Sequence, residues 1–189
     1  MCVAGNSIET PRLLLLSGTP SFPDGLANSS GHVGRNYMRH LTGTVWGHFD
    51  KPVRMYRGET MAGVIADESI HDPDRGFSGG YYMETISLGP AFMASFVEPG
   101  GWGPDFAALL DRYLNTAGMW IVGENMPQES NRVTLNTTVK DTNGLPVPNV
   151  HYDDHANDLA MREHAYAAGQ RVYEAVGAQT SHHTPPYPS

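Results

Sequence analysis

Near its start, the chain has a threonine, a proline and an arginine followed by four consecutive leucines, and this pattern constrains the fold more than any other. Thr10 suits the N-cap of a helix, and Pro11 suits the first helical position, where its missing N–H has no intrahelical partner to lose. The leucines at 13–16 continue the helix, and Gly18 is placed to end it in a left-handed conformation. Because the short apolar segment 2–4 and a Gly5-Asn6 turn come first, the sequence predicts a strand-turn-helix opening.

The rest of the chain predicts an α+β fold in which short strands outnumber helices. Glycine and proline are abundant (21 and 14 residues), which favours turns between short elements. Helical spacing of apolar residues predicts helices over 104–117 and 158–176. We expect an irregular loop over 18–43 and an irregular tail over 179–189. β-branched and aromatic residues between turn signals predict strands at 44–49, 53–57, 61–66, 81–88, 119–124, 132–135 and 145–150.

Charge and composition exclude several classes of function. The net charge of −8 argues against a nucleic-acid partner, because neutralising phosphates requires a basic surface. No stretch of 18 apolar residues exists, so we expect no transmembrane segment. The single cysteine, Cys2, excludes an internal disulfide. It does not discriminate between compartments, and a soluble chain of this composition suits either a cytoplasmic or a periplasmic location.

The histidines are the natural candidates for chemistry, and each also has an ordinary structural interpretation. His151 and His155 are four residues apart with Asp153 and Asp154 between them, which on a helix is a metal-binding spacing. The pattern falls at a strand-to-helix junction, where Asp caps are common, so we expect no metal there. His40 is a candidate buried hydrogen-bonding residue, and His71 lies in a polar loop where we expect it to be solvated.

Residue types and spacing alone also assign no catalytic role to two further groups, the histidine pair in the tail and a set of aromatic and methionine side chains. His182 and His183 are adjacent in the proline-rich tail, where neighbouring side chains point apart. An aromatic and methionine-rich group suits either a substrate pocket or simple packing of the sheet. No dinucleotide fingerprint of the form G-x-G-x-x-G is present. The aromatic and methionine group comprises Trp46, Tyr56, Tyr81, Tyr82, Met83 and Trp120.

A family resemblance goes further than these patterns. Residues 4–18 (AGNSIETPRLLLLSG) resemble the second signature of the glucose-methanol-choline (GMC) oxidoreductases, a turn of small residues followed by Ser/Thr-Pro, an aliphatic run and Ser-Gly. Asn6 stands where many members have Gly or Ser, and Thr19-Pro20 replaces an aliphatic-Gly pair. These departures resemble the gluconate 2-dehydrogenase flavoprotein-like branch.

The remainder of the chain resembles the same family in the same order. Residues 25–40 (GLANSSGHVGRNYMRH) look like the family segment Val-Gly-x-Asn-Leu-x-Asp-His, with Arg39 in place of the commoner Asp. The resemblance to the start of the family's C-terminal region is carried by 124–127, 131–135, Lys140-Asp141, 144–148, Tyr152, His155, Asn157 and Asp158.

The resemblance implies an FAD-dependent oxidoreductase that acts on the CH–OH group of an alcohol, sugar or sugar acid, with this chain as an internal or C-terminal fragment, incomplete at both ends. It implies that Gly5, Asn6, Thr10 and Pro11 approach FAD. No catalytic residue is expected in this chain, since the family's catalytic histidine would follow just beyond Ser189, and His182 and His183 do not match its motif. The isolated chain is expected to retain no FAD and to be inactive.

The implied architecture divides the chain into consecutive stretches. Residues 1–43 would close a Rossmann-like FAD-binding domain, 44–150 would form the antiparallel substrate-domain sheet with its flanking helices, and 151–189 would return toward the FAD domain. The implied partners are a small alcohol or sugar substrate, the flanking parts of the same polypeptide, and an electron-acceptor subunit. The alternative is a non-catalytic, β-rich module that binds a sugar or a partner protein.

Overall fold

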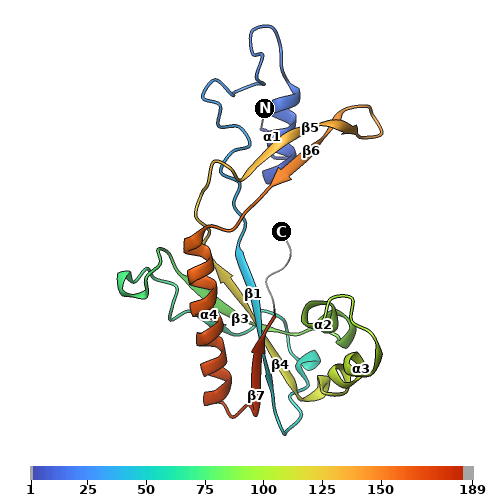
Figure 1. The fold of residues 1–189 in the computed structure, drawn as a ribbon, viewed down its shortest axis with the longest axis vertical. Helices are drawn as coiled ribbons and strands as arrows, with labels where there is room; N and C mark the ends of the chain where they lie inside the picture. The colour runs from blue at the N-terminus through green and yellow to red at the C-terminus, as the bar shows by residue number, and fades with distance from the viewer. Residues whose placement is uncertain (1, 185–189) are drawn as a thin grey trace. The chain divides into compact units, whose positions relative to one another are not determined.

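The computed structural model describes residues 2–184 as two compact units, and each unit takes two separate stretches of the chain (Figure 1). One comprises residues 2–39 with Met126–His155, and the other comprises His40–Asn125 with residues 156–184. Sequence reasoning expects consecutive stretches instead. The assignment of those stretches to an FAD domain and a substrate domain stays a prediction.

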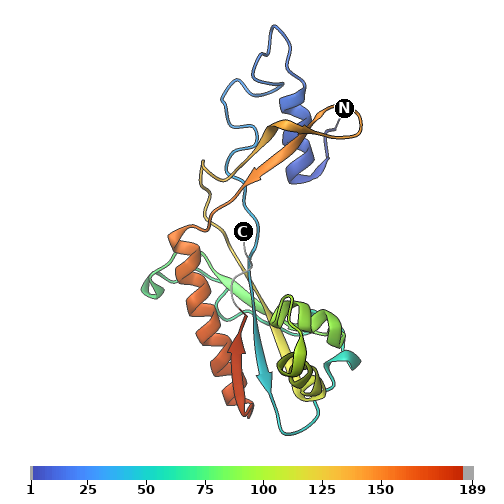
Figure 2. The same ribbon diagram turned by 45° about the vertical axis from the view of Figure 1, so that its right-hand side comes forward.

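The larger unit is an antiparallel five-stranded sheet in the order β2-β3-β4-β1-β7. Figure 2 shows the sheet between a long helix, α4, on one face and the short helices α2 and α3 on the other. This arrangement confirms a mixed fold of helices and an antiparallel sheet. Its elements are β1 (Leu41–His48), β2 (Val64–Ile65), β3 (Tyr81–Ile86), α2 (Pro90–Val97), α3 (Gly103–Asp111), β4 (Thr116–Gly123), α4 (Ala156–Ala175) and β7 (Thr180–His183).

Glycines on strand β1 allow α4 to pack closely on the sheet. A β-carbon at Gly43 would lie 2.7 Å from the ring of Tyr166, and one at Gly47 would lie 2.6 Å from the ring of Tyr173. The two tyrosines are seven residues apart, so they project from the same side of the helix. Helix α4 and strand β1 therefore pack through tyrosine rings that lie directly against the glycine backbone, in a core that also includes Val45.

The opposite face of the sheet has its own core around Trp46. The indole is fully buried and packs with Met55, Ile86, Met93 and Tyr113. Met93 comes from α2, a helix that the sequence patterns did not predict, although Pro90 at its first position is a signal for a helix start.

The smaller unit packs one helix against a two-stranded hairpin. Helix α1 (Asn6–Leu16) contacts both β5 (Arg132–Lys140) and β6 (Pro146–His151). The Arg12 guanidinium joins them, since Nη2 donates to Asp141 at 2.6 Å and Nε donates to the Pro146 carbonyl at 2.9 Å. The turn at 141–144 forms as expected: Gly144 has a φ of 77°, and the Asp141 side chain accepts from the Leu145 N–H.

The opening of the chain differs from the expected strand-turn-helix. Residues 2–4 are exposed and form no strand, because no described residue pairs with them. The helix begins at Asn6 rather than Thr10, which places Pro11 inside it. Gly18 is not left-handed. The helix ends at Leu16 with Ser17 as its C-cap, and the Ser17 N–H donates to the Leu13 and Leu14 carbonyls.

Other local expectations also need correction. Val53–Arg57 is not a strand, because Arg54 adopts a φ of 55° and the chain turns into a 3-10 helix at Met55–Arg57. Of the strand expected at 61–66, only Val64–Ile65 forms. The helix expected over 104–117 ends at Asp111, because Thr116 already begins β4. The expected irregular tail contains β7, which pairs with β1.

Candidate functional site

The four residues expected to approach FAD lie together at the start of α1. The Gly5 N–H donates to Thr10 Oγ1 at 2.9 Å, so Thr10 satisfies the turn from inside the helix rather than as its N-cap. Asn6 has a φ of 71°, and its side-chain oxygen accepts from the Ile8 N–H at 2.9 Å. Pro11 occupies the middle of the helix. These hydrogen bonds close a turn that is exposed to solvent. The turn leads into the N-terminus of α1, which carries a partial positive charge.

A polar network crosses the sheet on the face opposite α4. Thr44 and Thr184 are buried, and their hydroxyls lie 2.7 Å apart. Trp46 Nε1 donates to the Thr44 hydroxyl at 2.8 Å. The Thr184 N–H also donates to the Thr44 carbonyl, at 3.1 Å. The network therefore fixes the end of β7 to β1 through both backbone and side chains.

Two histidines lie on this same face. The rings of His48 and His182 stack with centroids 5.1 Å apart, and His48 Nδ1 lies 3.0 Å from Thr116 Oγ1. Burial, reinforced by Arg112, lowers the pKa of His48 below its usual value. Burial, reinforced by His48 and His183, lowers the pKa of His182 to about 4. Both imidazoles are therefore neutral near pH 7 and contribute to the fold as uncharged, stacked rings.

The remaining histidine and aromatic candidates fall mainly into packing roles. His183 stacks on Tyr166 with centroids 4.1 Å apart, and His40 is exposed rather than buried. Tyr81 bonds to His164 Nδ1 at 2.9 Å, and burial raises the Tyr81 pKa to about 12. Trp46, Tyr81 and Met83 are buried in the two cores, Tyr82 and Trp120 are half-buried, and Tyr56 is exposed.

The suspected metal ligands lie at the junction between β6 and α4. His151 Nε2 contacts the Asp153 carboxylate at 2.9 Å, and the backbone of Asp153 exchanges two hydrogen bonds with the Asn131 side chain. Within residues 2–184, no group of three or more His, Cys, Asp or Glu side chains is placed to hold a metal ion. The expectation that no metal binds here stays a prediction.

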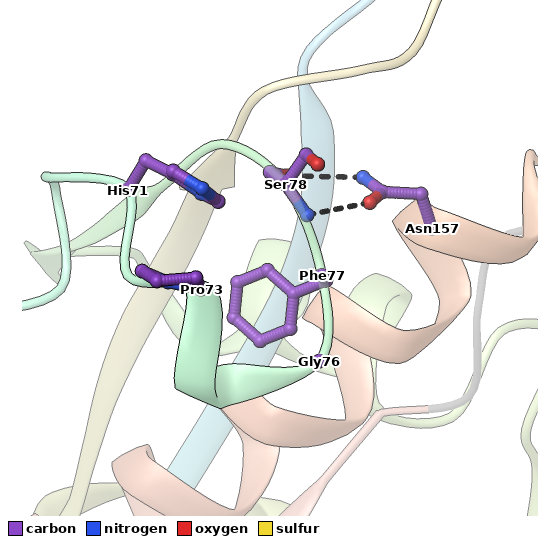
Figure 3. A pocket seen from close by; sticks show the side chains of 6 residues that line it. All are labelled: His71, Pro73, Gly76, Phe77, Ser78 and Asn157. Carbon is purple, nitrogen blue, oxygen red and sulfur yellow. Dashed lines mark hydrogen bonds between the residues drawn. The ribbon is translucent and has the colours of Figure 1, made fainter.

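A small pocket opens beside the N-terminus of α4 (Figure 3). Its volume is about 310 Å³, and sequence reasoning assigned it no role. Asn157 closes one side, since its side chain accepts from the Ser78 N–H at 2.7 Å and donates to the Ser78 carbonyl at 3.1 Å. Phe77 is 5% exposed and forms part of the base. The lining residues are His71, Pro73, Gly76, Phe77, Ser78 and Asn157.

Comparisons with known proteins agree with the family resemblance. Residues 127–188 match the family model described as GMC oxidoreductase. The chain is 36% identical over 186 residues to 2-methyl-1,2-propanediol dehydrogenase of Mycolicibacterium austroafricanum, covering 93% of this chain and 33% of that protein. It is 30% identical over 158 residues to the fructose dehydrogenase large subunit of Gluconobacter japonicus, covering 80% of this chain and 28% of that protein.

Two facts bound what these similarities imply. The chain spans about a third of the length of the curated relatives it matches. In the part of the chain that the structure describes, no helix combines the length and the apolar character needed to cross a membrane.

Proposed function

The chain belongs to the GMC oxidoreductase family, and from that premise we propose that it is part of a flavoprotein that oxidises the CH–OH group of an alcohol, a sugar or a sugar acid. The similarity to a diol dehydrogenase over almost the whole chain is the observation that carries the proposal. FAD is the cofactor of the whole enzyme in this proposal.

The start of α1 is the part of this chain that suits contact with FAD. The turn is exposed, Gly5 carries no side chain, and the helix N-terminus favours a phosphate or carbonyl oxygen. A dinucleotide fingerprint is missing from the chain, so Gly5, Asn6, Thr10 and Pro11 would form an edge of the site rather than a complete cradle. When bound, the flavin supplies the acceptor for the hydride that leaves the alcohol carbon.

The remaining segments of the chain are assigned to the two domains of the proposed enzyme. In this proposal, residues 1–43 close the FAD-binding domain, 44–150 form the antiparallel sheet of the substrate domain with its helices, and 151–189 return toward the FAD domain. The β5–β6 hairpin packs with α1, which favours placing the hairpin beside the FAD-domain segment. The rigid sheet would orient the substrate and exclude water from it.

We assign the base that takes the hydroxyl proton to no residue of this chain. His182 is half-buried in β7 and stacked on His48, and His183 is stacked on Tyr166, so both rings are committed to packing. The base would come from another part of the same polypeptide.

The names of the two relatives support a substrate class and a partner. One is described as acting on 2-methyl-1,2-propanediol and the other on fructose, and both compounds are neutral and carry at least two hydroxyl groups. Among the alcohols, sugars and sugar acids of the proposal, these two names favour the small neutral alcohols and sugars. Because one relative is described as a large subunit, an electron-acceptor subunit is the expected protein partner.

The test is to read the DNA that flanks this coding sequence and to express the extended polypeptide. We expect G-x-G-x-x-G upstream and, downstream, His-x-x-Gly-Thr, the segment that carries the catalytic histidine in this family. The purified extended protein should show flavin absorbance near roughly 450 nm. That protein should reduce an artificial electron acceptor when supplied with 2-methyl-1,2-propanediol or fructose. The 189-residue chain purified by itself should be colourless.

The alternative is a non-catalytic module that binds a sugar or a partner protein. Flanking sequence without either motif, together with an extended protein that carries no flavin, would favour this alternative and overturn the oxidoreductase proposal.

A further inference from the structure

The loop that lines the small pocket beside α4 is built around a buried arginine. The Arg75 guanidinium donates to the Glu68 carboxylate at 2.6 Å, to the Glu68 carbonyl at 3.1 Å and to the Gly79 carbonyl at 3.4 Å. It also donates to the Ile70 carbonyl, and its side chain is only 8% exposed. These bonds hold residues 68–79 in one shape without relying on a large apolar core.

The other end of the loop is fixed from α4. The Asn157 side chain bonds both the N–H and the carbonyl of Ser78, much as a neighbouring strand would. The pocket is therefore already formed in the absence of a ligand, which reduces the entropic cost of binding one.

Two polar groups line the pocket without being used by the fold. The His71 imidazole and the Ser78 hydroxyl make no hydrogen bond to any other residue within 2–184. Figure 3 shows the His71 ring extending from its loop toward Ser78, with Pro73 and Phe77 below. An imidazole and a hydroxyl can each donate and accept, which is the chemistry that recognises alcohol groups.

The charges around the pocket disfavour an anionic ligand. Arg75, the cation nearest in sequence to the lining, is committed to Glu68 and to three backbone carbonyls. Asp72 and Asp74 lie in the same loop and add negative charge. These two full negative charges oppose a phosphate or a carboxylate and outweigh the partial positive charge at the N-terminus of α4, whereas a neutral ligand is affected by neither.

We propose that this pocket binds a small neutral polyol, with His71 and Ser78 bonding its hydroxyls and the Pro73 and Phe77 rings contacting its carbon frame. The volume of about 310 Å³ lies near the lower end of the range for small-molecule sites, about 300–1,000 Å³. The pocket lies wholly within residues 71–157 of the larger unit, so binding here needs neither flavin nor the flanking polypeptide.

The test is an NMR titration of the ¹⁵N-labelled 189-residue chain with D-sorbitol, with sodium sulfate as the anionic comparator. We expect saturable shifts for residues 71–78 and 157 with sorbitol and none with sulfate. His71→Ala and Ser78→Ala should each weaken sorbitol binding about 2- to 12-fold, as expected for one neutral hydrogen bond. His71→Gln, which keeps a hydrogen-bonding group, should recover part of the loss.

The matched control is His32→Ala, which removes an exposed imidazole from the other unit and should leave the affinity unchanged. The proposal is overturned if sorbitol produces no saturable shift, if the shifts lie elsewhere, or if sulfate binds at residues 71–78 as tightly as sorbitol. A sorbitol-binding chain whose extended form carries no flavin would leave this inference standing while removing the proposed oxidoreductase function.

Discussion

The indole of Trp46 lies over the backbone of Gly118 on the neighbouring strand, so closely that a β-carbon at position 118 would fall 2.5 Å from the ring. The two residues are directly paired between β1 and β4. A glycine in a strand has no side chain to pack, and here the aromatic neighbour fills the space it leaves. The pair therefore joins the sheet to the core beneath α2.

Gly118→Ala should destabilise the chain by about 1–3 kcal/mol, because the added methyl group would overlap the ring of Trp46, which is fully buried. Urea denaturation followed by tryptophan fluorescence would measure the change. Gly89→Ala is the matched control, since a β-carbon there meets nothing within 4 Å. An equal effect from both substitutions would show that the Trp46–Gly118 contact is not the cause.

Thr44→Val should cost about 1–3 kcal/mol, the penalty for leaving buried polar groups unsatisfied. The substitution removes the acceptor of Trp46 Nε1 and the partner of the Thr184 hydroxyl while nearly preserving volume. Thr42→Val, at an exposed position of the same strand, should change the free energy of unfolding little. The idea fails if amides of residues 180–184 exchange with solvent equally fast in both variants.

Stability should fall as the pH drops from about 6.5 toward about 4, because of His182. Its folded pKa lies below its unfolded value, so the unfolded chain takes up a proton first in that window and is favoured. Above pH 6.5 both states are neutral and the effect vanishes. The lowered pKa of His48 acts in the same direction.

His182→Gln should therefore reduce the difference in unfolding free energy between pH 7 and pH 5. Exposed His32→Gln should leave that difference as it is in the wild-type chain. A His182 ring that titrates near 6.5 by NMR would contradict the assignment.

Asp141→Asn should make the packing of α1 less sensitive to acid. Hydrogen bonds from the Leu145 backbone and from Arg12 hold the pKa of Asp141 below its usual value. A lowered carboxyl pKa stabilises the fold above the unfolded pKa, and that contribution is lost as the pH falls through the folded pKa. Hydrogen exchange of α1 amides at pH 3 and pH 6 would test this, with Asp24→Asn, in the irregular loop after α1, as the control. A wild-type helix that is equally protected at both pH values would contradict it.

Sequence patterns located most of the regular elements because their periodicity is local. The strand at 81–86, the turn at 141–144 and the long C-terminal helix follow from alternation, a positive-φ glycine and helical spacing. The errors arise where distant residues decide. Val53 and Arg54 both donate to the Leu114 carbonyl rather than to a hairpin partner, and Thr180–His183 becomes a strand only because β1 offers an edge.

The site was less accessible to sequence reasoning for the same reason. The residues at the start of α1 were found because a local motif marks them. The pocket depends on Asn157 reaching Ser78 across 79 positions, and no local pattern reports that contact. The stacked pair of His48 and His182 likewise joins two segments that appear unrelated in the sequence.

Because each unit takes two separate stretches of the chain, its elements can pack only in a certain order during synthesis. Arg12 and Asp141 are separated by 129 positions, so α1 leaves the ribosome long before the hairpin that covers it exists. At about 5–20 residues per second, that helix waits roughly 6–26 s for the hairpin against which it packs. Meanwhile β1, β3 and β4 lie within His40–Asn125 and can pair as soon as they emerge. Vectorial synthesis thus favours a central sheet that assembles early, while the first helix made is among the last to dock.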